Sequence, residues 1–440
     1  MSYDSRSTIV ARAPQVAEIA AQYSDEAETA RQLSPQVVRA VLDAGFARHF
    51  VPAAHGGVPG GFSELTSAVA LIGEGCTSAA WAASLAAYAG RYAAFLPEAG
   101  QAEIWAEGPD VVLAGALMPS GKAEPVAGGW RLSGEWKYIS GVHFADWALA
   151  CAAVPPKDAE AGEAGEAGEA SEASETGETA ETGEKAEKAE KAEKAEKAKS
   201  PANAQNTKAA RNSADRPEVR FFAVPRADFS IEDSWDTVGM RGTGSHTLVL
   251  SDVFVPEHLT LPRSAVHAGR ATASDARCHI VPMYAVNSLP FAAPLIGAAR
   301  GALRAWTART GQRVDRRGRA VREMPSAQVS LARSAAEVDA AELLILRTAA
   351  VADGTECPPE GEAAVRGARD LALAVELLVS AVDRVFRASG TSGQSSSDPV
   401  QRFWRDVNSA ASHVALSFET TGAAYGAWAL SGNERTEPVR

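Results

Sequence analysis

GEWKYISGVHFADW (Gly134 to Trp147) and DTVGMRGTGSHTLVLSDVFVP (Asp236 to Pro256) are the stretches that decide the fold of this 440-residue chain. The first runs as a strand to its glycine and resumes with apolar residues that favour strands, so we predict a hairpin. Its tip would present the ring of Tyr138 and the hydroxyl of Ser140. An aromatic face can stack on a flat redox ring, and a short hydroxyl can bond a ring nitrogen. A sandwich hairpin with a polar tip would show the same pattern, so this stretch alone leaves both interpretations open.

The order of the motifs supports the first interpretation. The pattern W-x-Y-I-S-G-x-x-x-A-D-W, followed by G-M-R-G-T-G-S and D-V-F-V-P, resembles the middle domain of the acyl-CoA dehydrogenase superfamily. The variant is similar to the two-component, reduced-flavin-dependent monooxygenases, which hydroxylate phenols and aromatic polyketides or N-oxidise amino sugars. This resemblance implies an acyl-CoA dehydrogenase-like fold with an α-helical N-terminal domain (residues 1–110), a β-barrel middle domain (111–265) and a C-terminal four-helix bundle (266–440).

Composition narrows the class of protein. The net charge is −12 and no basic stripe occurs, so we expect no nucleic-acid partner. The four cysteines form no C-x-x-C pair, which predicts a reduced, cytoplasmic chain without a structural metal site. We find no apolar leader and no run of the ~18 apolar residues that a membrane span needs, so we expect no membrane association.

A low-complexity insert interrupts the strand-rich region. Residues 155–217 include Gly-Glu-Ala and then Glu-Lys-Ala repeats without apolar anchors, so we predict a disordered insert with no chemical role, in which the Glu-Lys-Ala half can form a fraying, solvated helix.

Helical patterns flank the strands. Ser34 followed by Pro35 predicts a capped helix start, and Gly45 ends this helix after Ala44. Ser63 and Thr77 are further candidate caps. Four long segments near the C-terminus are expected to form the bundle: Leu289 to Thr310, Pro325 to Asp353, Gly361 to Ser389, and Pro399 to Leu430.

The resemblance assigns flavin contacts residue by residue. Tyr138 would lie beside the isoalloxazine ring, and Ser140 would reach its N5 edge. Met118 and Ser120, in the turn after the first strand, would lie under the ring. The remaining contacts would come from the bundle of a neighbouring subunit and imply a homotetramer: Gln328, Gly390, Thr391 and Gly393.

The loop G-M-R-G-T-G-S is not a dinucleotide-binding motif, because a strand follows it and the third glycine is missing. By resemblance it places Gly244 and Ser245 at the substrate mouth of the flavin pocket. No other dinucleotide fingerprint is present, so a separate NAD(P)H:flavin reductase is expected to supply reduced flavin, either FMNH2 or FADH2.

The stretch QRFWRDVNSAASH, Gln401 to His413, carries the remaining candidate. Arg405-Asp406 resembles an Arg-Asp pair of the family, and the position of the dehydrogenases' catalytic glutamate then corresponds to Val414. An apolar residue cannot remove a proton, whereas the adjacent His413 is the type that the hydroxylases use there. His413 would deprotonate or hydrogen-bond a phenol.

The resemblance therefore implies a monooxygenase in which reduced flavin and O2 form a C4a-hydroperoxide that hydroxylates an aromatic substrate. Ser140 would hold the N5 proton of the flavin and His413 would act on the substrate. Three alternatives stay open: an N-oxygenase (nitrososynthase) of a nucleotide-linked amino sugar, an acyl-CoA dehydrogenase, and a non-catalytic flavin-binding protein.

Overall fold

The computed structural model describes residues 8–155, 217–354 and 361–431. Contacts divide the chain into Met1–Val154 together with Val219–Arg440, and a separate unit, Pro155–Glu218. The fold described here belongs to the first unit. The predicted disordered insert lies outside the described residues except for its two ends.

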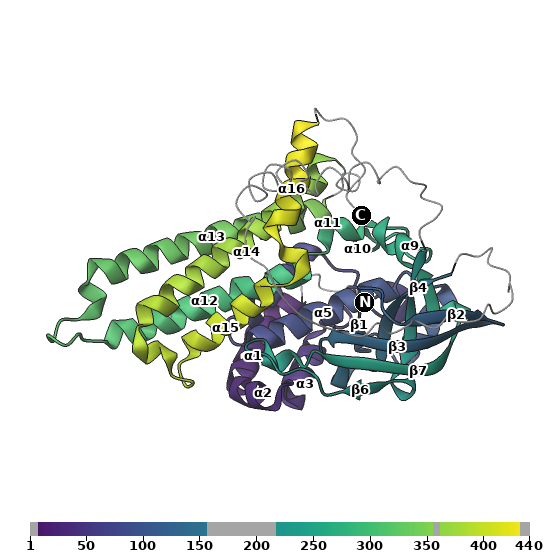
Figure 1. Ribbon diagram of the computed structural model, residues 1–440, viewed down its shortest axis with the longest axis horizontal. Coiled ribbons are helices and arrows are strands. Elements are labelled where there is room, and N and C mark those ends of the chain that lie inside the picture. The colour runs from purple at the N-terminus through teal and green to yellow at the C-terminus, as the bar shows by residue number, and fades with distance from the viewer. Residues whose placement is uncertain (1–7, 156–216, 355–360, 432–440) are drawn as a thin grey trace, which may run out of the picture. The chain divides into compact units, whose positions relative to one another are not determined.

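The N-terminal region is helical, as the sequence predicts (Figure 1). Pro35–Ala44 (α3) has the predicted bounds, and the Ser34 side chain accepts a hydrogen bond from the Val37 N–H at its start. The other helices are α1 (Thr8–Gln22), α2 (Ser24–Ala30), α4 (Phe62–Gly73), α5 (Thr77–Ala93) and α6 (Glu98–Ile104).

The caps predicted for the next two helices are wrong. The side chain of Thr77 does not cap α5, which Cys76 precedes without a side-chain cap. Ser63 lies inside α4, whose start is capped from a distant helix. Both carboxylate oxygens of Asp353 accept hydrogen bonds, from the Phe62 N–H at 2.6 Å and the Ser63 N–H at 2.8 Å. A residue 290 positions away therefore satisfies this helix terminus, which local sequence rules do not reveal.

Eight described strands form two four-stranded sheets with the orders β1-β4-β5-β8 and β2-β3-β7-β6. They are the β-domain that the sequence predicts between two helical regions. Their bounds are β1 Leu113–Gly115, β2 Lys122–Val126, β3 Gly129–Ile139, β4 Trp147–Val154, β5 Glu218–Pro225, β6 Ser230–Glu232, β7 His246–Pro256 and β8 Thr260–Pro262.

The predicted hairpin is wrong. Strand β3 pairs antiparallel with β7, with Trp136 opposite Leu248 and Ile139 opposite His246, whereas β4 belongs to the other sheet. The two stretches that decide the fold therefore pair with each other, and the turn after Ser140 crosses between sheets. An alternating pattern identifies a strand and its buried face, but it does not identify the partner strand.

The C-terminal bundle contains α12 (Leu289–Gln312), α13 (Pro325–Asp353), α14 (Glu362–Ser389) and α15 (Pro399–Ala411), as the sequence predicts for the first three. The predicted helix Pro399 to Leu430 is broken into α15, a short turn, and α16 (Phe418–Leu430). His413 has an extended backbone at the break, with φ −64° and ψ 131°. Short helices α9 (Arg263–His267), α10 (Arg277–Ile280) and α11 (Met283–Val286) lead into the bundle.

Helix α5 connects the helical and β parts of the molecule. It contacts α4, α12, α15 and strand β1, and most of its side chains are buried. The nearby helices α4 and α12 pack very closely, because a Cβ atom at Gly297 would overlap the Ala70 carbonyl oxygen. Helix α5 contacts both of these helices and forms one wall of the cavity described below.

Removing the insert is expected to leave the fold intact. Its two ends follow β4 and precede β5, which are neighbours in one sheet, so a short linker can join them. We expect a chain with residues 162–199 deleted to keep its melting temperature and its turnover rate. Thermal unfolding and activity measurements check this, and a melting temperature lowered by more than about 4 °C would contradict it.

Candidate active site

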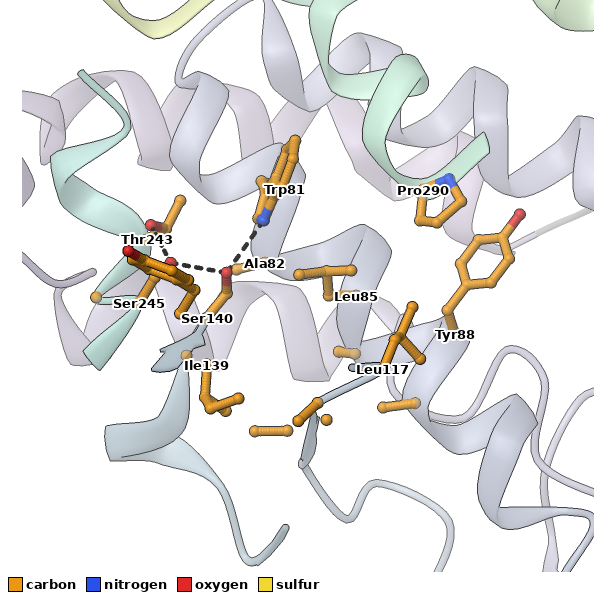
Figure 2. A pocket seen from close by; sticks show the side chains of 18 of the residues that line it. Trp81, Ala82, Leu85, Tyr88, Leu117, Ile139, Ser140, Thr243, Ser245 and Pro290 are labelled. Carbon is orange, nitrogen blue, oxygen red and sulfur yellow. Dashed lines mark hydrogen bonds between the residues drawn. The ribbon is translucent and has the colours of Figure 1, made fainter. Parts of the chain in front are cut away.

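A cavity of about 1270 Å³ lies where α5, the ends of β1 and β3, the loop before β7, and the bundle meet. Figure 2 shows part of it, with Trp81, Leu85 and Tyr88 projecting from α5. The lining includes seven of the residues that the sequence predicts for the site: Met118, Ser120, Tyr138, Ser140, Gly244, Ser245 and His413.

Tyr138 is presented to the cavity by an irregular strand. The β3–β7 register shifts between Trp136 and Ile139, and Tyr138 adopts a positive φ of 67°. A bulky residue rarely takes this conformation, and such strain often accompanies a functional side-chain orientation. Tyr138 is 72% exposed, and its ring lies 6.2 Å from the Trp235 ring, edge to face. An unburied aromatic face is thus available to a flat ligand.

The turn under the predicted flavin ring is held by hydrogen bonds. The Ser120 N–H donates to the Cys151 carbonyl at 2.9 Å, and the Ser120 hydroxyl donates to the Glu135 carbonyl at 2.7 Å. Met118, two residues earlier, is 68% exposed and lines the cavity. Ser120 therefore positions the turn with its own proton, and Met118 offers the free apolar surface.

Ser140 belongs to a network of hydroxyl groups (Figure 2). The Trp81 indole Nε1 donates to Ser140 Oγ at 3.1 Å, Ser140 Oγ lies 2.8 Å from Ser245 Oγ, and Ser245 Oγ lies 2.7 Å from Thr243 Oγ1. Sequence analysis missed Trp81 and Thr243. The signals were a lone tryptophan in an alanine-rich helix and a threonine inside the glycine-rich loop.

The Arg405-Asp406 pair anchors the loop that bears Ser245. Asp406 Oδ1 accepts a hydrogen bond from the Met240 N–H at 2.7 Å, and the Arg405 guanidinium donates to the Val238 carbonyl. Burial raises the pKa of Asp406 to about 6. A Cβ atom at Gly239 would overlap the Arg405 carbonyl oxygen, so this position requires glycine. The loop is thus held against α15.

His413 lies in an aromatic cluster at the helix break. Its ring stacks on Phe291 with centroids 3.8 Å apart and meets the Trp81 ring edge to face at 6.0 Å. Burial lowers the pKa of His413 to about 4, so the imidazole is neutral near neutral pH. Its Nδ1 accepts a hydrogen bond from the Ala415 N–H at 3.2 Å, which assigns the ring proton to Nε2. His413 is therefore placed to donate a hydrogen bond from Nε2.

The position of the dehydrogenase base carries no acid. Val414 is 75% exposed and lines the cavity, whereas Glu419 is exposed on α16 and does not line it. Among the described residues that line the cavity, the carboxylate is Glu135, on β3. The helix break thus offers an imidazole and no proton-abstracting carboxylate.

Four predicted flavin contacts do not line this cavity: Gln328, Gly390, Thr391 and Gly393. The Gln328 amide donates to the Arg322 carbonyl at 3.1 Å on the exposed surface of α13. Gly390, with φ 66°, begins the turn between α14 and α15, where Arg313 donates to the Ser389 carbonyl. Their contact with flavin stays a prediction that requires a neighbouring subunit.

The cavity residues fit an isoalloxazine ring. Single-ligand pockets typically measure about 300–1,000 Å³, so about 1270 Å³ leaves room for the ring and a second molecule. The exposed faces of Tyr138 and Met118 suit a flat ring, and Ser140 Oγ suits its N5 edge. Among the described residues we find no group of three or more side chains that could hold a metal ion. Nor does the described part of the chain contain a helix with the length and hydropathy to span a membrane.

Comparison with known proteins agrees with this geometry. Residues 289–418 match the family described as acyl-CoA dehydrogenase, C-terminal domain. The chain is 30% identical over 435 residues to the oxygenase component of the FADH(2)-dependent resorcinol hydroxylase of Rhizobium sp. (strain MTP-10005), covering 95% of this chain and 93% of that protein. It is 28% identical over 413 residues to the oxygenase subunit HsaA of a flavin-dependent monooxygenase of Mycobacterium tuberculosis (91% and 89% covered). The crystal structure of 3-HSA hydroxylase from Rhodococcus sp. RHA1 superposes with a TM-score of 0.78 at 25% identity, covering 99% of this chain and 100% of that one.

The chain therefore belongs to the oxygenase components of the two-component flavin-dependent monooxygenases, which have the acyl-CoA dehydrogenase-like fold. It is an oxidoreductase that uses reduced flavin and O2, as the sequence predicts. Membership in a two-component system also implies that a separate flavin reductase supplies the reduced cofactor.

Ser140→Ala is expected to uncouple the reaction without abolishing flavin binding. A hydroxyl at N5 contributes only ~0.5–1.5 kcal/mol as a hydrogen bond, which is small beside the contacts of a whole ring. The same free energy changes the rate at which the N5 proton is lost by up to about tenfold. We expect more hydrogen peroxide per reduced flavin consumed, with flavin affinity changed by less than about tenfold. Unchanged coupling would place Ser140 away from N5.

Proposed function

We propose that the protein hydroxylates a phenolic ring, with reduced FMN or FAD bound between the β-domain and the bundle. The observation that carries this proposal is the neutral imidazole of His413, which lines the cavity within a cluster of aromatic rings. The names of similar proteins support the substrate class, since they include a resorcinol hydroxylase and a p-hydroxyphenylacetate 3-hydroxylase.

Each residue has a distinct task in this proposal. Reduced flavin supplies the electrons that activate O2 and delivers one oxygen atom to the substrate. Tyr138 and Met118 would hold the flavin ring, and Ser140 would form a hydrogen bond at its N5 edge. The Nε2–H of His413 donates a hydrogen bond to the substrate oxygen and so favours its phenolate form, in which the ring is the better nucleophile. The buried helix α5 excludes water from the reacting atoms.

The cavity lining favours a phenol over a nucleotide-linked amino sugar. Its substrate side is apolar, with Val38, Val41 and Leu42 from α3, Leu85 from α5, and Leu33 from the segment between α2 and α3. Two phosphate groups would call for several cations. Among the described lining residues, the lysine and arginine side chains are those of Lys137 and Arg263. An acyl-CoA dehydrogenase is disfavoured because Val414 stands where the base is required.

The assembly and location of the protein belong to the same proposal. We propose a homotetramer, because Gly390, Thr391, Gly393 and Gln328 do not line the cavity of their own chain and would serve that of a neighbour. We propose a cytoplasmic location, since the described cysteines are buried free thiols. Molecular-mass measurement in solution tests the first point.

The decisive experiment supplies electrons in two ways. The purified chain with free flavin is expected not to oxidise NADH or NADPH, whereas addition of a flavin reductase should start product formation from a phenol. The panel contains mono- and dihydroxybenzenes, larger fused-ring phenols and nucleotide-linked amino sugars, each with FMN and with FAD. Oxygenation of the amino sugars alone would replace the proposed function, and direct oxidation of nicotinamide by the pure chain would contradict a two-component system.

A further inference from the structure

The hydroxyl network around Ser140 has a fixed hydrogen-bond direction. It begins at Trp81 Nε1, passes through the side-chain oxygens of Ser140, Ser245 and Thr243, and ends at the Met240 carbonyl oxygen. The four successive distances are 3.1, 2.8, 2.7 and 2.8 Å. Figure 2 shows the first three links. All four are within ordinary hydrogen-bond range.

The two ends determine the direction of every link. An indole N–H can only donate, and a carbonyl oxygen can only accept. Thr243 has one hydroxyl proton and donates it to the Met240 carbonyl, so it must accept from Ser245. Ser245 has then used its own proton and must accept from Ser140. The proton of Ser140 is therefore taken up by Ser245 and is not available to a ligand.

Ser140 consequently faces the cavity as an acceptor. Its proton goes to Ser245, one lone pair receives the Trp81 N–H, and one lone pair remains. Thr243 is 3% exposed and Ser245 is 4% exposed, so little water can reach these hydroxyl groups and rearrange their hydrogen bonds. A group that meets the remaining lone pair has to bring its own hydrogen.

The two redox states of flavin differ at this point. The N5 atom of a reduced flavin carries a hydrogen and can donate, whereas the N5 atom of an oxidised flavin has a lone pair and can only accept. An acceptor opposite N5 forms a hydrogen bond with the reduced ring and faces a second lone pair in the oxidised ring. The direction of the hydrogen bonds at Ser140 thus distinguishes reduced from oxidised flavin.

We propose that Thr243, acting through Ser245, orients the Ser140 hydroxyl as an acceptor and thereby makes the site select reduced over oxidised flavin. Thr243 is a positioning residue, because it lies two hydrogen bonds away from the proposed N5 contact. The inference rests on the proposed function, which places Ser140 at N5. Selection of this kind suits an oxygenase that receives reduced flavin from a reductase and has to release the oxidised product.

Thr243→Val is expected to reverse the direction of these hydrogen bonds with little change in the shape of the side chain. Valine keeps the branched side chain but accepts no hydrogen bond, so the Ser245 proton turns to Ser140 and the Ser140 proton becomes available to the cavity. Oxidised flavin is then expected to bind more tightly and reduced flavin more weakly. The dissociation constant of oxidised flavin divided by that of reduced flavin should therefore fall by about tenfold, because one hydrogen bond is exchanged for a repulsive contact.

The test compares binding of oxidised and reduced FMN and FAD. Equilibrium dialysis gives the dissociation constant of the oxidised form, and anaerobic titration with dithionite-reduced flavin gives that of the reduced form. Thr243→Ser is the matched control, since it keeps the hydroxyl and should keep the wild-type ratio. Ser245→Ala breaks the chain at a second point and should lower the ratio as Thr243→Val does. The midpoint potential of bound flavin provides a second readout, falling by about 30 mV for each tenfold fall in the ratio.

The outcomes separate this inference from the proposed function. If the wild type prefers reduced flavin and Thr243→Val keeps that preference within about twofold, the inference is wrong while the function stands. An equal loss of preference in Thr243→Val and Thr243→Ser would show a packing role and would also overturn it. If the wild type binds neither form, the proposed function fails and the inference fails with it. A lowered ratio in Thr243→Val and Ser245→Ala, restored in Thr243→Ser, supports the proposal.

Discussion

His413→Ala slows product formation by about 10- to 100-fold, because a hydrogen bond to a charged group contributes ~1.5–3 kcal/mol. The imidazole donates from Nε2, since its Nδ1 accepts the Ala415 N–H. Loss of that donor leaves the phenolate oxygen without a partner, so less of the substrate is present in the form whose ring attacks. Single-turnover mixing of reduced flavin, oxygen and substrate measures the rate of product formation. Flavin affinity, measured separately, is expected to change by less than about tenfold.

His413→Gln distinguishes a donor from a base. Glutamine presents an N–H near the position of Nε2 but cannot take up a proton. A donor role predicts that His413→Gln recovers much of the rate that His413→Ala loses. If both variants are equally slow while their melting temperatures match the wild type, His413 acts as a general base instead. If both match the wild-type rate, the stack on Phe291 is its main role.

Asp406→Leu is expected to lower the free energy of unfolding by about 1–3 kcal/mol, because the Met240 N–H loses its buried acceptor. The same change releases the loop that carries Thr243 and Ser245, so flavin binding should weaken as well. Asp406→Asn is the matched control, since its side-chain oxygen can still accept from Met240. Chemical denaturation and flavin titration measure the two effects. Equal stability of the Leu and Asn variants would show that this hydrogen bond does not hold the loop.

The pH dependence of stability provides an independent check on Asp406. Burial raises its pKa from 3.8 to about 6 in the folded protein, so the folded state binds the proton more tightly than the unfolded state. The wild type therefore loses stability as pH rises from about 4 through about 6, whereas Asp406→Asn lacks this contribution. A pKa shift of about two units corresponds to ~3 kcal/mol. The free energy of unfolding of the wild type should fall by this amount relative to that of Asp406→Asn. A constant difference across this range would contradict the buried, charged carboxylate.

Local sequence predicted the elements of this protein well. The cap and proline of α3 predict its bounds, and the apolar periodicity predicts α12, α13 and α14, because these signals act within one or two turns of chain. The order of motifs predicted the family, and with it the reduced-flavin chemistry. Strand pairing was not predictable in this way. The assumed hairpin is a crossing between two sheets, since alternation does not specify a partner.

The sequence alone determined most of the helices and strands, and which motifs point to a flavin monooxygenase. Only the tertiary structure brought Trp81 and Ser245, 59 and 105 positions from Ser140, into hydrogen-bond contact with it. It also made His413 a neutral donor, because packing against Phe291 removes water from the imidazole and lowers its pKa. Periodicity records the buried face of each element, but hydrogen-bond direction and desolvation depend on what packs against that face.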